Sequence, residues 1–136
     1  MKAHNHFIGR EHKIVVFGKN KYKVTLAAFI CGEDIVAIIG GGEKPHVGAV
    51  AVAIPHPSHK DSKISCTSSV FTLFGHKDDV VARPISERIA TQLNKTTVVI
   101  AGLHIEKASK KDINKLVSNS MRCAEKMLEE IKKALR

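Results

Sequence analysis

The run from Ala49 to Ile54, AVAVAI, restricts the possible folds more than any other stretch, because it is apolar at every position. Alternate side chains of a β-strand point to opposite faces of its sheet, so neither side of this strand suits water. Strands of this kind are normally buried on both faces. The sheet that contains it therefore needs a cover on each side.

Two segments have the 3.6-residue spacing of an amphipathic helix. Asp78 and Asp79 suit the start of the first helix, and Pro84 predicts a kink or a later true start. The second helix begins at Ser109, and Asp112 completes a capping-box-like pattern. The apolar positions of the first helix are Val81, Ile85, Ile89 and Leu93, and those of the second are Ile113, Leu116, Val117, Met121, Ala124, Leu128 and Ile131.

Alternating or β-branched stretches predict about six strands. They cover residues 12–17, 22–31, 35–39, 47–54, 64–74 and 96–103. A turn at 18–21 makes the first two a hairpin, and the last strand is expected to lie centrally. Residues 40–48 are expected to form a loop and 55–61 an exposed connection, because Pro55 and Pro57 lack backbone donors. A meander is the simplest topology.

These elements predict one α+β domain over residues 1–136. It has a mostly antiparallel sheet of about six strands and two helices, with the long C-terminal helix packed on one face. Two helices cover only one side of such a sheet. The other side must curl on itself or meet a partner, so we expect a homodimer or a higher homo-oligomer.

The formal charge of +9 is compatible with phosphate binding, but five Phe, one Tyr and no Trp leave few rings for stacking bases. The lysines lie around the first hairpin and along the last helix, which favours a solvated basic surface over a nucleic-acid site. No apolar run is long enough to cross a bilayer, and no signal-like segment follows Met1. We therefore expect a cytoplasmic protein that binds neither nucleic acid nor membrane.

The most unusual stretch combines Gly40, Gly41 and Gly42 with Lys44. Consecutive glycines can turn their amides toward a common centre, and a nearby ammonium group adds positive charge. A phosphate would fit such a loop, although it lacks the spacing of a Walker motif. The alternative is a flexible or bulged connection, which the loop alone does not exclude.

Three histidines, His46, His76 and His104, lie beside the ends of expected elements, where an imidazole could contact a ligand or carry a proton. Their spacing does not predict a metal site. Ser68 and Ser69 lie on a partly polar strand and either face a pocket or satisfy each other. No nucleophile motif surrounds them, so no catalytic residue is assigned. Cys31, Cys66 and Cys123 form no C-x-x-C pair and are expected to be reduced and buried.

Several of these segments together resemble a known family. They are the run from Gly40 to Ala51, Ser68-Ser69-Val70, Gly75-His76-Lys77-Asp78-Asp79 and Ala101-Gly102-Leu103-His104-Ile105. The chain resembles, over nearly its whole length, the prenylated-flavin chaperones, the small D subunits that accompany hydroxyarylic-acid decarboxylases. The fold of that family is similar to that of proteasome assembly chaperones.

This resemblance implies a non-catalytic protein that binds prenylated FMN, or FMN, and passes it to a decarboxylase large subunit. It implies that the three glycines and Lys44 hold the phosphate, with His46, His76 and His104 near the ring or ribityl chain. Two alternatives remain. One is an assembly protein without a small ligand, and the other is a histidine-dependent enzyme that acts on a phosphorylated substrate.

Overall fold

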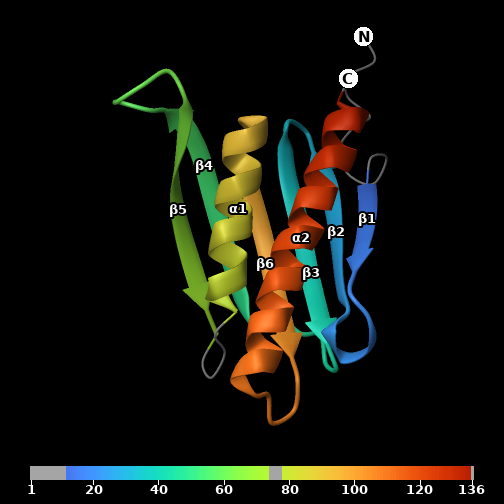
Figure 1. Cartoon of the computed structure of the whole chain (residues 1–136). Helices are drawn as coiled ribbons and strands as arrows, with labels where there is room; N and C mark the ends of the chain where they lie inside the picture. The colour runs from blue at the N-terminus through green and yellow to red at the C-terminus, as the bar shows by residue number, and fades with distance from the viewer. Residues whose placement is uncertain (1–11, 74–77, 136) are drawn as a thin grey trace.

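The computed structural model describes residues 12–73 and 78–135. Within these residues the chain forms six strands, two α-helices and one short 3-10 turn (Figure 1). They are β1 (His12–Phe17), η2 (Asn20–Tyr22), β2 (Val24–Cys31), β3 (Asp34–Gly42), β4 (Ala49–Pro57), β5 (Ile64–Thr72), α1 (Asp79–Leu93), β6 (Thr97–His104) and α2 (Lys110–Ala134). The predicted α+β class, with a long C-terminal helix, is confirmed.

The sheet has the order β1-β2-β3-β6-β4-β5, and all neighbours are antiparallel except β3 and β6. The predicted first hairpin and the central position of the last strand are confirmed. The meander is wrong, because β6 lies between β3 and β4. Such a pairing is decided by long-range contacts. Val99 and Ala101 face the helices and Val98 and Ile100 face the other side, so β6 is apolar on both faces and lies between two other strands.

Two predicted loops are partly strand. β3 continues through the three glycines to Gly42, which lies opposite His104 of β6. β4 continues to Pro57, although both prolines were expected to end it. They are tolerated because β6 pairs only with the part of β4 from Ala49 to Ala53, so the remainder of β4 has an unpaired edge.

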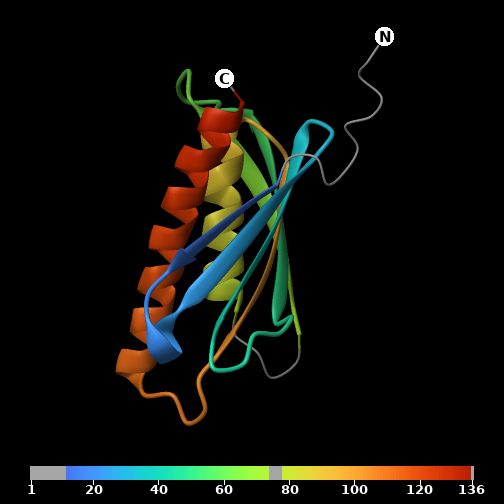
Figure 2. The same ribbon diagram turned by 90° about the vertical axis from the view of Figure 1, so that its right-hand side faces the viewer.

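Both helices lie on the same face of the sheet, as Figure 2 shows. α1 packs on β4, β5 and β6, whereas α2 packs on β1 and β2. α1 begins at Asp79 and runs through Pro84, so the alternative of a later start is wrong. The side chains with no exposed surface between sheet and helices include Val24, Leu26, Ile35, Ile39, Ile85, Ile89, Val99, Cys123 and Met127.

The opposite face of the sheet carries no helix among the described residues (Figure 2). Large apolar side chains remain exposed there: Ile14 by 63%, Ile38 by 46%, Ile54 by 53% and Phe71 by 72%. We call this surface the open face. The prediction that two helices would cover one side of the sheet and leave the other bare is confirmed.

The start of α2 is fixed by the predicted capping box. The Ser109 hydroxyl accepts from the Asp112 amide at 3.0 Å, and the Asp112 carboxylate accepts from the Ser109 amide at 3.0 Å. Tyr22 of η2 donates its hydroxyl hydrogen to the same carboxylate at 2.6 Å. The bonds from Tyr22 and Ser109 hold the pKa of Asp112 well below its usual value, and the bond to Asp112 raises the pKa of Tyr22. This junction attaches α2 to the edge of the sheet.

The Tyr22–Asp112 bond predicts a pH-dependent stability. Because the folded pKa of Asp112 is lowered, its contribution is complete above the unfolded value of about 3.9 and is lost as the pH falls below that value. Tyr22→Phe removes the largest cause of the shift. Urea denaturation should therefore show a variant less stable than the wild type at pH 7, with a smaller difference at pH 3. Ser118→Ala, exposed on α2, is the control, and an equal Tyr22→Phe effect at both pH values would contradict the assignment.

Candidate functional site

Several element ends meet at one end of the molecule (Figure 1). The carboxyl ends of β3 and β6 lie there, together with the first turns of α1 and α2 and the connection from β3 to β4. The parallel pairing of β3 with β6 produces this arrangement, because parallel strands finish at the same edge of a sheet. Gly40, Gly41, Gly42, Lys44, His46 and His104 all belong to this end.

A pocket of about 460 Å³ opens between α1, α2 and the end of β6. Its walls are mostly aliphatic, and Val80 and Ile113 leave about half of their surface exposed, at 51% and 49%. The complete lining is Asp78, Val80, Val81, Leu103, His104, Ile105, Lys107, Ala108, Ile113, Leu116 and Val117. Apolar walls with a few polar groups at one side suit a small amphipathic molecule.

The carboxylate of Asp78 joins three elements beside this pocket. It is only 7% exposed, and its Oδ1 accepts from the amide of Leu103 in β6 at 3.0 Å. Its Oδ2 lies 3.2 Å from Nε2 of His46, whose Nδ1 lies 3.1 Å from the carbonyl oxygen of Lys44. Both of these partners of the imidazole only accept, so the ring makes both bonds at once in its protonated form. The Asp78 carboxylate thereby supports the wall of the pocket.

A second histidine lies at the mouth of the pocket. The His104 ring meets the His46 ring edge to face, with 6.3 Å between centroids, and its Nε2 lies 3.2 Å from Glu106. The amide of Glu106 in turn donates to the Glu43 carboxylate at 2.8 Å. The described lining contains no serine, threonine or cysteine. The polar groups that the described lining offers beside its aliphatic walls are an imidazole, a lysine and a carboxylate, from His104, Lys107 and Asp78.

The backbone amides of the glycine stretch are not free, which corrects the predicted anion cradle. The amide of Gly42 donates to the carbonyl of Lys23 at 3.1 Å, and those of Glu43 and Lys44 donate to the carbonyl of His104 at 2.7 and 3.3 Å. The amide of Gly48 donates to Ala101 at 2.9 Å. Because β3 extends through the glycines, these amides belong to the sheet and its closing turn. That the glycines or Lys44 contact a ligand by other atoms stays a prediction.

Close packing explains the glycines instead. A Cβ atom at Gly102 would collide with the carbonyl oxygen of His46, and one at Gly48 would collide with the carboxylate of Asp78. A Cβ atom at Gly41 would lie 2.5 Å from the carbonyl oxygen of Lys23. Gly42 has a φ of +75°, which residues with side chains rarely adopt. These glycines let the connection from β3 to β4 lie directly on the sheet.

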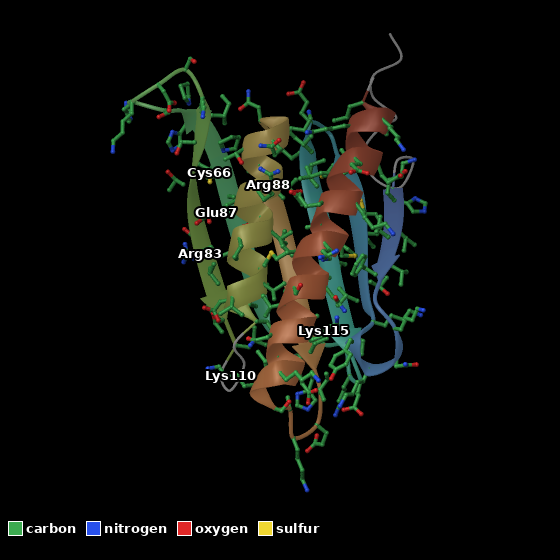
Figure 3. All side chains as sticks on the ribbon, viewed as in Figure 1. Cys66, Arg83, Glu87, Arg88, Lys110 and Lys115 are labelled. Carbon is green, nitrogen blue, oxygen red and sulfur yellow. The ribbon has the colours of Figure 1, made fainter. Side chains whose placement is uncertain are left out.

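Ser68 and Ser69 do not reach the pocket. Both lie in the middle of β5, and Ser69 pairs with Val52, which pairs with Val98 at the far end of β6 from His104. The Ser68 hydroxyl donates to Glu87 at 2.7 Å and accepts from Arg83 at 2.8 Å, and thereby ties β5 to α1 (Figure 3). His76 lies outside the described residues.

Cys66 and Cys123 have the character of structural thiols. Burial, with a smaller effect of Glu87, raises the pKa of Cys66, and burial raises the pKa of Cys123 to about 11. Thiols shifted in this direction are poor nucleophiles near neutral pH. All three are free, but only Cys123 is fully buried, so the expectation that all would be buried is wrong for Cys31 and Cys66.

The described part of the chain contains neither a candidate metal site nor a membrane-spanning helix. Over residues 12–73 and 78–135, no group of three or more His, Cys, Asp or Glu side chains is placed to hold a metal ion. Neither described helix is long and apolar enough to span a membrane.

Sequence analysis missed the apolar walls and Lys107. Ile113 and Val117 were assigned to the helical core, yet both line the pocket beyond the capping box, and Lys107 lies in the turn before α2 with a φ of +51°. The sequence feature that could have indicated these pocket residues is the short connection between β6 and α2. It places the start of an amphipathic helix beside the end of a central strand.

Comparisons with known proteins agree on family and fold. A sequence model of the prenylated flavin chaperone LpdD-like domain matches residues 18–132. Protein LpdD of Lactiplantibacillus plantarum is 24% identical over 92 residues, which are 68% of this chain and 65% of that protein. The matched region thus spans just under two thirds of that relative's length.

A solved structure shares the fold. It is described as the crystal structure of a novel chaperone complex for yeast 20S proteasome assembly. One of its chains superposes with a TM-score of 0.56 at 19% identity, covering 92% of this chain and 98% of that chain. The expected likeness to proteasome assembly chaperones is confirmed at the level of fold.

Gly102→Ala should test whether close backbone contact fixes the connection above β6. The added methyl group meets the His46 carbonyl oxygen, so we expect a loss of about 1–3 kcal/mol in the free energy of unfolding. Gly40→Ala is the matched control, since its methyl group would come within 3.1 Å of the Pro45 side chain and in ordinary contact with the Gly102 carbonyl oxygen, at 3.5 Å. Equal unfolding free energies for the two variants in urea titrations would contradict this explanation.

Proposed function

Because the chain belongs to the prenylated-flavin chaperone family, we propose that it binds prenylated FMN and passes it to a decarboxylase large subunit without catalysing a reaction. The observation that carries this proposal is the mostly aliphatic pocket between α1, β6 and α2. Its volume of about 460 Å³ falls within the usual range of small-molecule sites. We place this activity in the cytoplasm.

The pocket offers separate surfaces for the two parts of such a ligand. Val80, Ile113 and Val117 would contact the flat ring system and its added hydrocarbon ring, since they present exposed apolar surface. No phenylalanine or tyrosine belongs to the described lining, so the contacts to the ring would be aliphatic, with the His104 imidazole at its edge.

The phosphate would be held on the basic side of the pocket. Lys107 belongs to the lining, and the first turns of both helices border it, so the positive ends of two helix dipoles favour an anion there. Lys110, Lys111 and Lys115 follow on the exposed surface of α2, of which Figure 3 labels the first and last. Cations at a helix N-terminus oppose its dipole, and a bound phosphate would offset that repulsion.

The predicted contact residues take different roles in this proposal. His104 lines the pocket, and His46 supports it through Asp78. Lys44 lies on the neighbouring turn, where its charge can attract the phosphate. Contacts from Gly40, Gly41, Gly42, Ser68, Ser69 and His76 stay predictions.

An assembly protein without a small ligand is the second candidate. The exposed apolar residues of the open face favour it, because such surfaces mark sites of protein contact. The two candidates differ in ligand retention. An assembly protein would elute from gel filtration without flavin even when loaded with an excess.

Ile113→Asp should abolish most flavin binding and leave the fold intact. Ile113 is half-exposed in the first turns of α2, where a carboxylate suits the helix dipole, so the helix should tolerate it. Inside the pocket it would repel the phosphate and polarise an apolar wall. We expect the Kd for FMN, and for reduced prenylated FMN under anaerobic conditions, to rise roughly tenfold or more by fluorescence titration. Leu135→Asp, at the other end of α2, is the control, and unchanged affinity in Ile113→Asp would remove the pocket as the site.

Lys107→Asn should separate the phosphate contact from the ring contact. Asparagine tolerates the left-handed backbone of this position, so the turn should persist. Loss of one charge-assisted contact should weaken FMN binding roughly tenfold and leave riboflavin, which lacks the phosphate, unaffected. The affinities of Lys44→Ala for FMN and riboflavin are measured in the same way for comparison. A loss confined to Lys44→Ala would move the phosphate to the glycine turn and contradict the placement at Lys107.

A further inference from the structure

The open face is almost free of charge in a chain with 26% charged residues. Alternation along the strands assigns its residues, and among the described ones only Asp34, at the first position of β3, is charged. The others are His12, Ile14, Val16, Thr25, Ala27, Phe29, Cys31, Val36, Ile38, Gly40, Gly42, Val50, Val52, Ile54, His56, Ser65, Thr67, Ser69, Phe71, Val98 and Ile100. At one end of the face the connection of residues 43–48 covers Gly102, and His104 lines the flavin pocket. A surface of this composition is unusual on a protein that remains alone in water.

The charge of the whole chain restricts what can cover this surface. Two copies that each carry +9 repel one another unless they meet where the cations are absent. The open face is such a place, because the lysines of α2 lie on the other side of the sheet. A second copy is therefore an occupant that the electrostatics allow here.

The dimensions of the face suit a stable dimer. Six strands of six to nine residues, at about 4.8 Å between strands and about 3.3 Å per residue, span roughly 700 Å². Stable interfaces bury about 800 Å² of accessible surface on each partner. Two open faces packed together come close to that size.

The rim supplies complementary charges that select the orientation. Asp34 begins β3 at one end of the face, and Lys23, beside Gly42, lies at the other end. Ile38 lies midway between them and is 46% exposed. A two-fold axis through Ile38, perpendicular to the strands, brings the Asp34 end of one copy over the Lys23 end of the other, twice.

Shape agrees with this orientation. Gly40 and Gly42 leave a hollow of about 430 Å³ near Lys23 on the open face, bordered by Thr25, Ala27 and Ile38. The same symmetry places the Asp34 end of the second copy above this hollow. Isologous contact then repeats the fit on both copies.

We propose that the protein is a two-fold homodimer in which two open faces pack into a β-sandwich centred on Ile38. The two sheets then form an apolar interior like that of other sandwiches. The flavin pocket stays accessible in this dimer, because it opens between the helices. The dimer does not depend on flavin binding.

Ile38→Lys tests the centre of the interface. The side chain is half-exposed in a single copy, so the variant should fold, with an unchanged circular dichroism spectrum. Light scattering after gel filtration should give about twice 14.9 kDa for the wild type and 14.9 kDa for Ile38→Lys. Ile54→Lys, on the same face, should also dissociate, whereas Leu135→Lys at the end of α2 should remain a dimer. A monomeric wild type, or an Ile38→Lys protein that remains dimeric, would overturn the proposal.

A charge exchange tests the orientation. Asp34→Lys sets two cations against each other at both ends of the interface, so the dimer Kd should rise roughly two- to fivefold at low salt. Adding Lys23→Asp to the same chain restores opposite charges and should recover the wild-type Kd by sedimentation equilibrium. Additive effects of the two substitutions would show that the ends do not meet and would overturn this orientation.

Discussion

The carboxylate of Asp78 joins the elements that make the pocket. It is nearly buried, it accepts from the amide of Leu103 in β6, and it lies against His46 of the turn after β3. Since it directly precedes α1, the same side chain sets the helix start relative to the sheet. A buried carboxylate needs such partners, because desolvation of an unpaired charge is costly. Strand, turn and helix therefore stay in one arrangement, and the aliphatic walls of the pocket depend on it.

The sequence predicts an element correctly where the contacts that decide its structure are between residues close together in the chain. The turn after Phe17 gave the first hairpin, and Ser109 with Asp112 gave the start of α2, because the deciding contacts lie within a few residues. The place of β6 between β3 and β4 could not be obtained in this way. Thr97 pairs with both Ile35 and Ala53, which are far from it in sequence, and the strand pattern is also compatible with a meander.

The site was predicted in part, and the glycines show why. Of the predicted contact residues, His104 lines the pocket and His46 lies beside it, whereas Gly40 does not belong to the lining. The expectation of free glycine amides was wrong, because a glycine run is compatible both with free amides and with backbone that passes close to other backbone. Only the partner atoms separate these cases, such as the His46 carbonyl oxygen above Gly102. Ile113 and Val117 were missed as pocket residues because the helical pattern assigns every apolar position to the core.

The aliphatic lining of the pocket also bears on kinetics. Dissociation rates account for most differences in affinity, and the described lining holds no Phe or Tyr, so a flavin bound there would gain less attraction from stacking. Val80 and Ile113 are half-exposed, so a molecule bound against them would lie close to solvent. For the proposed carrier this favours a brief residence time, so that the receiving enzyme can take up the cofactor without any rearrangement of the fold.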